Sequence, residues 1–151
     1  MVKLLKALLL LTLVISSSVF AFPCYLTVVK DNCWTNYDVT VTMSNLQTNA
    51  KVTNVLVPKG KSWERQQFSC EAGQTLTYYA TFQPAIWENQ ANTAYKAVSF
   101  WTLPTTIGVH DLAWNLTACF PRDFSSTPTP IDSTANCSCD VSDIPEPKPT
   151  P

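Results

Sequence analysis

After residue 21, hydrophobic and polar side chains alternate along much of the chain with a period of two, which is typical of half-buried β-strands. The clearest stretches are residues 37–43, 75–82 and 112–118, in which apolar side chains occupy one face. Four further stretches follow the pattern less regularly, at residues 24–30, 51–57, 62–68 and 95–102. The alternation predicts about seven strands and no long helix in this part of the chain.

Strands this short and this numerous predict an all-β fold, namely a two-sheet antiparallel sandwich of immunoglobulin-like size. Turn signals such as Pro58-Lys59-Gly60 separate the candidate strands. A small barrel is the alternative architecture. The Cys–Trp–Cys spacing of true immunoglobulin domains is absent, because Trp34 directly follows Cys33. The prediction therefore concerns the architecture and not a family.

The first 21 residues have the features of a secretory signal peptide. Lys3 and Lys6 form its positively charged region, residues 4–15 form its apolar stretch, and a small-x-small cleavage site ends at Ala21. The apolar stretch is shorter than the roughly 20 residues that span a bilayer. We therefore expect a cleaved chain that starts at Phe22, has no membrane span and is secreted or periplasmic.

Charge and proline content divide the remaining chain into a β-domain at residues 22–120 and a tail at residues 121–151. Without the signal peptide the chain has 8 basic and 11 acidic residues, a net charge of −3, and all of this excess lies in the tail. The tail also holds 7 of the 11 prolines and includes a polyproline-like stretch at residues 144–149. Because the domain is neutral, strong electrostatic binding of nucleic acid is excluded.

The even number of cysteines behind a signal peptide predicts structural disulfides formed in an oxidising compartment. The six positions are Cys24, Cys33, Cys70, Cys119, Cys137 and Cys139. Zinc is the rival interpretation, but the paired C-x-x-C spacing that zinc sites use is absent. A redox-active Cys137-Ser138-Cys139 motif is a second rival.

Strand register gives a pairing hypothesis for these cysteines. Cys119 shares its strand face with Asn115 and Thr117, so it is expected to point outward. An outward cysteine needs a partner that crosses outside the sheet, and the tail can supply Cys137 or Cys139. The tail is therefore expected to be stapled to the domain. For the other cysteines we expect a bond between Cys33 and Cys70.

The sequence offers few of the side chains that catalysis requires. His110 is the single histidine, and its neighbour Asp111 is expected to point the opposite way in an extended chain. No nucleophile motif, phosphate-binding glycine loop or metal-protease motif is present. We predict that the protein is not an enzyme and uses no metal or cofactor.

Two aromatic positions are candidates for binding. Trp63 shares a strand face with Arg65, which is a polar neighbourhood for an indole; in the alternative, Arg65 simply stacks on Trp63. Trp87 and Glu88 lie in a long loop at residues 83–94, where Trp87 either contacts a ligand or folds back as an anchor. A second long loop covers residues 103–111.

These features favour an exported, non-enzymatic binding module that contacts a protein partner through its long loops and the aromatic–polar strand face. One alternative is a carbohydrate-binding protein in which the exposed tryptophans stack on sugars. Another is a structural accessory subunit of a cell-envelope assembly, with the tail as a spacer.

Overall fold

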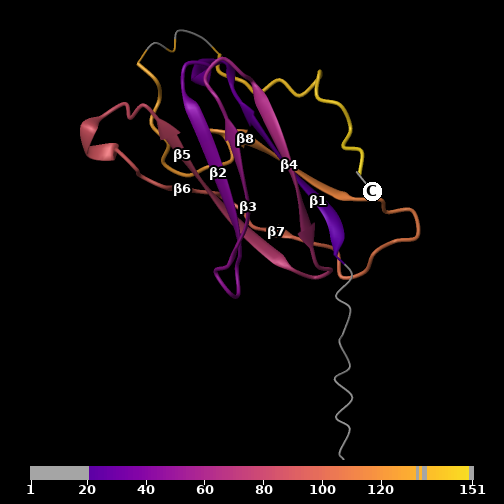
Figure 1. Ribbon diagram of the computed structural model, residues 1–151. Coiled ribbons are helices and arrows are strands. Elements are labelled where there is room, and N and C mark those ends of the chain that lie inside the picture. The colour runs from indigo at the N-terminus through magenta and orange to yellow at the C-terminus, as the bar shows by residue number, and fades with distance from the viewer. Residues whose placement is uncertain (1–20, 132, 134–135, 150–151) are drawn as a thin grey trace, which may run out of the picture.

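The computed structural model describes residues 21–131, 133 and 136–149. The predicted signal peptide therefore lies outside the described residues, apart from Ala21. Within the described part, eight strands form two open sheets, which confirms the disulfide-stapled β-sandwich and not the barrel (Figure 1).

Sheet A has three strands in the order β4 (Trp63–Cys70), β1 (Phe22–Lys30) and β8 (Trp114–Phe120). Sheet B has the order β3 (Lys51–Val57), β2 (Asp38–Asn45), β5 (Thr75–Gln83) and β6 (Tyr95–Lys96), and β7 (Trp101–Thr102) also pairs with β5. Two short 3-10 helices, η1 (Asn32–Trp34) and η2 (Glu88–Gln90), follow β1 and β5.

Alternation within the strands builds the core between the sheets. Each of β1, β2 and β5 turns every second side chain inward, and these side chains join one buried cluster. Trp34 of η1 fills one end of this cluster and is 1% exposed. Its ring centroid lies 4.7 Å from those of both Phe82 and Phe120. The backbone N–H of Cys33 donates to the Asp31 carboxylate, which caps η1 and fixes the position of Trp34.

The expectation of purely antiparallel sheets is wrong at one pair. Strands β1 and β8 run parallel, with Cys24 opposite Trp114 and Lys30 opposite Phe120. These strands come from the two ends of the domain, so no hairpin dictates their relative direction. Local alternation contains no information about such a long-range pairing.

Two predicted strands differ more than the others from the bounds that the structure has. The segment 95–102 divides into β6 and β7. The N–H of Ala97 still donates to the carbonyl of Tyr78 in β5, but Ala97 also bridges to Phe124, and the N–H of Val98 donates to the carbonyl of Asp123 outside the sheet. Strand β8 starts at Trp114, and Leu112 is 74% exposed instead of facing the core. Trp114 packs against the core and its ring lies 4.5 Å from Phe22.

Candidate functional site

The outer face of sheet A carries the strand-borne candidates, Trp63 and Arg65. Residues with odd numbers in β1, β4 and β8 point away from the core, and pairing register aligns them in three rows. The rows across β4, β1 and β8 are Trp63–Val29–Cys119, Arg65–Thr27–Thr117 and Gln67–Tyr25–Asn115. We call this surface the outer face.

Arg65 stacks on Trp63, as the alternative interpretation of this pair predicts. The guanidinium carbon lies 5.6 Å from the centroid of the indole ring. Arg65 Nε also donates to Oγ1 of Thr27 at 2.7 Å, and Thr27 Oγ1 donates to Oδ1 of Asn115 at 3.1 Å. A cation–π contact and a hydrogen-bond chain thus hold the guanidinium in place across all three strands.

The tail covers part of the outer face. Arg65 Nη1 donates to the carbonyl oxygen of Pro145 at 2.8 Å. The Tyr25 hydroxyl shares its single proton between the carbonyl oxygen of Lys148 at 2.9 Å and Oε1 of Gln67 at 3.0 Å. Further upstream, Asn32 and Ser138 join through two hydrogen bonds, one in each direction. Burial reflects this cover: Tyr25, Thr27 and Val29 are buried although they point away from the core.

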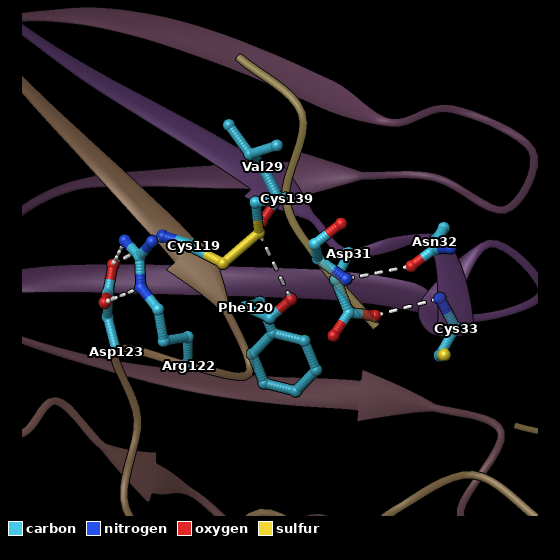
Figure 2. Close-up of a disulfide and its surroundings, with 10 residues drawn as sticks. Val29, Asp31, Asn32, Cys33, Cys119, Phe120, Arg122, Asp123 and Cys139 are labelled. Carbon is cyan, nitrogen blue, oxygen red and sulfur yellow. Dashed lines mark hydrogen bonds and ion pairs between the residues drawn. A yellow bond between two sulfur atoms is a disulfide. The ribbon is translucent and has the colours of Figure 1, made fainter. Parts of the chain in front are cut away.

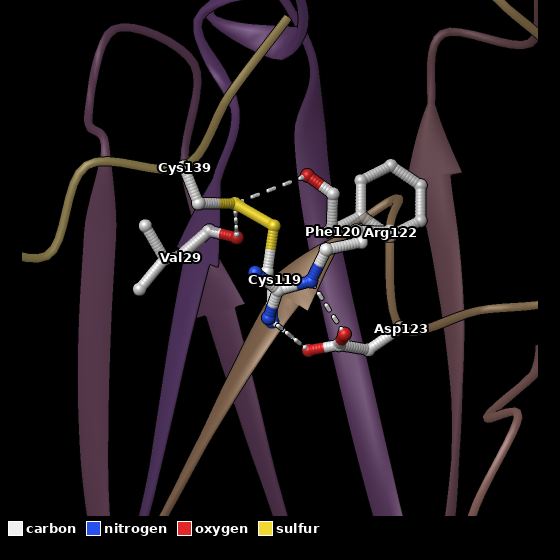
Figure 3. Close-up of polar contacts among 6 residues, drawn as sticks. All are labelled: Val29, Cys119, Phe120, Arg122, Asp123 and Cys139. Carbon is white, nitrogen blue, oxygen red and sulfur yellow. Dashed lines mark hydrogen bonds and ion pairs between the residues drawn. A yellow bond between two sulfur atoms is a disulfide. The ribbon is translucent and has the colours of Figure 1, made fainter.

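Two of the three disulfides attach the tail to the domain. Cys139 bonds to Cys119, as the outward register of Cys119 predicts. Figures 2 and 3 show this bridge with the Cys139 sulfur above the end of β1, 3.5 Å from the carbonyl oxygen of Val29. Cys137 bonds to Cys33, beside η1. Both tail cysteines therefore pair with the domain and not with each other.

The expected bond between Cys33 and Cys70 is wrong. Cys70 bonds instead to Cys24 within sheet A, where they occupy neighbouring rows of the β4–β1 pair, Phe22–Cys70 and Cys24–Phe68. Both side chains face the core and are almost fully buried. Because Cys33 lies on η1, beyond the end of β1, it can meet the tail and not the end of β4 at Cys70.

A cleft of about 220 Å³ lies between the tail and the end of the outer face that carries Trp63. Its lining includes Lys30, Asp31, Trp63, Asp140, Asp143 and Ile144. Burial lowers the pKa of Lys30, against the opposing effect of the Asp38 charge, and its Nζ donates to the carbonyls of Tyr37 and Pro58. Burial raises the pKa of Asp31, partly offset by the hydrogen bond from Cys33. The cleft thus combines charged side chains with two apolar ones, Trp63 and Ile144.

One group of potential metal ligands occurs among the described residues, and it does not form a metal site with its present bonding. The ligand atoms of Asp31, Cys33 and Cys137 lie within 4.8 Å of one another. The two sulfurs form a disulfide, however, and metals bind thiolates.

The loop candidates Trp87 and Glu88 lie elsewhere on the molecule. Trp87 precedes η2 and is 54% exposed, and Glu88 is the first residue of η2. Hydrogen bonds from Gln90 N to the Trp87 carbonyl and from Ala91 N to the Glu88 carbonyl give this loop a defined shape. Figure 1 shows the η2 loop beyond β5 and β6, on the side opposite to β4 and the yellow tail. The structure therefore does not join the Trp63–Arg65 pair and the Trp87–Glu88 pair into one site.

The second long loop forms an ordered apolar tip. Asp111 accepts a hydrogen bond from the Gly108 N–H at 2.8 Å, and its own N–H donates to the Gly108 carbonyl. The turn presents Val109, which is 94% exposed. In Figure 1 this loop, between β7 and β8, projects on the opposite side from the η2 loop.

Sequence reasoning missed two residues of the outer face, Tyr25 and Thr27. The alternation of β1 contains the signal that finds them, because Tyr25, Thr27 and Val29 share one face by parity. It also missed Phe124, which lies in the predicted tail but is buried against Tyr78 and Phe120.

No model of a known protein family matches this sequence, and no curated protein matches it either. The structure therefore defines the protein by its architecture, a disulfide-stapled β-sandwich whose tail is tied across one sheet. Its three disulfides indicate an oxidising compartment. Among the described residues, no helix has both the length and the apolar character needed to cross a membrane.

Proposed function

We propose that this chain is an exported, non-enzymatic binding module that contacts a protein partner. The contact uses the η2 loop with Trp87 and Glu88, and the outer face with Trp63 and Arg65. Export is supported by the predicted signal peptide and by the oxidising compartment that the disulfides indicate.

The exposure of Trp87 on an ordered, protruding loop is the observation that carries this proposal. A tryptophan that is 54% exposed leaves a large apolar surface in water, and such residues dominate the energetics of protein interfaces. Because hydrogen bonds already fix the loop around η2, binding orders few additional residues. Glu88 supplies an adjacent charge that selects the partner more than it strengthens the contact.

Affinity capture from the native compartment, followed by binding of the purified partner, tests the proposal. Trp87→Ala is expected to weaken binding at least tenfold, and Glu88→Gln about threefold. The matched control is Leu56→Ala, because Leu56 is similarly exposed, at 51%, on β3. A captured partner whose affinity is unchanged by Trp87→Ala contradicts the role of this loop.

Carbohydrate binding is the second candidate, since an exposed indole is also a stacking platform for sugars. A glycan array on the full chain separates the two. Sugar binding that disappears in Trp87→Ala or Trp63→Ala favours the carbohydrate candidate over the protein partner.

A further inference from the structure

We infer that the outer face of sheet A is a binding site for extended, proline-rich segments. Tail residues 144–149 are its built-in ligand, and a proline-rich segment of a partner protein is the ligand that replaces them. This inference rests on the proposed binding function and specifies the class of partner for one of its two surfaces.

The spacing of the two tail contacts indicates the conformation that the outer face recognises. Arg65 and Tyr25 donate to the carbonyls of Pro145 and Lys148, which are three residues apart. A polyproline II helix has three residues per turn, so these two carbonyls point to the same side. In a strand with a period of two they point to opposite sides. The two contacts on one surface therefore fit a segment with the three-residue repeat.

The donors on the sheet have a matching separation. Tyr25 and Arg65 occupy adjacent strands two positions apart, since Thr27 is opposite Arg65 and Tyr25 is opposite Gln67. Strand spacing and rise place such positions about 8 Å apart. One turn of polyproline II advances about 9 Å. The long Arg65 side chain easily absorbs this difference.

Both contacts use main-chain carbonyls of the tail, so they recognise conformation instead of side-chain identity. Prolines at 145, 147 and 149 fix φ and keep the intervening residues extended. A segment of this kind loses little conformational entropy on binding. Any partner segment with the same alternation of prolines can present carbonyls at the same spacing.

The tail leaves part of the site unfilled, which favours a partner segment as its second occupant. The cleft of about 220 Å³ beside Trp63 is bordered by the tail at Ile144. Proline-rich ligands dock on aromatic side chains, and a longer segment can extend over Trp63 into this space. A second copy of the chain is a poorer occupant, because it offers only the same tail. In that copy the Cys119–Cys139 disulfide holds the tail close to the outer face of the same molecule.

The tail can leave this site while the disulfides stay intact. Residues 144–149 lie beyond Cys139, the last residue in a disulfide. Their attachment nearby gives them an effective concentration on the order of millimolar, so the tail competes strongly with any ligand in solution. A test therefore has to weaken the tail before it measures binding.

The experiment uses the full chain and a synthetic peptide with the sequence of residues 141–149, with affinity measured by calorimetry. The variant Pro145→Gly/Pro147→Gly/Pro149→Gly frees the outer face and is expected to bind the peptide at least tenfold more tightly than the wild type does. Adding Tyr25→Phe or Arg65→Lys to this variant lowers affinity threefold to tenfold, the effect of one lost hydrogen bond. Tyr79→Phe, in sheet B, is the matched control and leaves affinity unchanged.

Three results overturn the inference. The first is that the glycine variant does not bind the peptide at millimolar concentration. The second is equal binding of a peptide with alanine in place of its prolines. The third is a wild-type dimer in sedimentation that the glycine variant abolishes, which assigns the site to a second copy. Trp87→Ala is expected to leave peptide binding unchanged and to weaken only the partner contact of the η2 loop. A failure of the peptide experiment therefore leaves the proposed contact of the η2 loop standing, and a failure of that contact leaves the peptide site standing.

Discussion

The backbone N–H of Cys119 donates a hydrogen bond of 2.7 Å to Oδ2 of Asp123, four residues further along the chain. Arg122 adds two hydrogen bonds to the same carboxylate, at 2.8 and 3.1 Å (Figure 3). Burial raises the pKa of Asp123, but the hydrogen bonds from Arg122 and Cys119 and the Arg122 charge together lower it below its ordinary value. This carboxylate therefore secures the end of β8, where the tail is stapled.

Removing the Asp123 carboxylate should destabilise the fold. Asp123→Ala leaves the buried N–H of Cys119 without its acceptor, which costs about 1–3 kcal/mol of the free energy of unfolding. Asp123→Asn retains an acceptor and is expected to lose less. Urea unfolding at neutral pH with disulfides intact measures both, and equal stability of Asp123→Ala and wild type contradicts the role of this bond.

The same carboxylate predicts an acid-dependent loss of stability. Its pKa is lower in the folded than in the unfolded chain, so its contribution is fully present above the ordinary value of 3.8. The contribution disappears as pH falls below 3.8 through the folded pKa. Wild type should therefore lose stability below that pH more steeply than Asp123→Asn does. If the free energy of unfolding falls in parallel with pH for the two proteins, the prediction is contradicted.

Truncation of two tryptophans should change the free energy of unfolding by very different amounts. Trp34→Ala removes a ring that is 1% exposed and packed on Phe82 and Phe120, so we expect a loss of about 3–5 kcal/mol in unfolding free energy. Trp87→Ala removes a ring that is 54% exposed and is expected to change stability by at most about 0.5 kcal/mol. Urea denaturation of both variants checks this contrast, and a large loss for Trp87→Ala would identify Trp87 as a structural anchor.

The disulfides should be reduced in a defined order. Cys137 is exposed and Cys33 half-buried, so a reductant reaches this bond in the folded protein. Cys24 and Cys70 are 0% and 2% exposed, and their bond needs the sandwich to open. Timed alkylation with mass spectrometry should label Cys33 and Cys137 first. Early labelling of Cys24 and Cys70 is incompatible with the core position of that bond.

The apolar tip of the β7–β8 loop should depend on one carboxylate. Asp111→Ala removes the acceptor for the Gly108 N–H, so amide hydrogen exchange in residues 107–112 should become at least tenfold faster. Because this turn is exposed, global stability should change by less than about 1 kcal/mol. Unchanged exchange at Gly108 would mean that other contacts hold the turn.

Sequence patterns predict individual strands well where one face is buried and the other is solvated. Residues 51–57 and 75–82 match β3 and β5 to within one residue, because alternating burial imposes the period of two along their whole length. The prediction fails at Leu112, which continues the apolar alternation but lies outside β8 in an exposed loop. Alternation records which faces side chains occupy, and it does not record where backbone pairing stops.

The sequence by itself determined the strand-rich architecture, the disulfide-bonded state and the outward direction of Cys119, because these depend on local alternation and on cysteine number. Only the tertiary structure decided that β1 and β8 run parallel, that Cys33 bonds to Cys137, and that the tail lies on Arg65. Each of these is a contact between segments far apart in the chain. Such contacts depend on how the sheets and the tail pack together, and no short-range pattern contains that information.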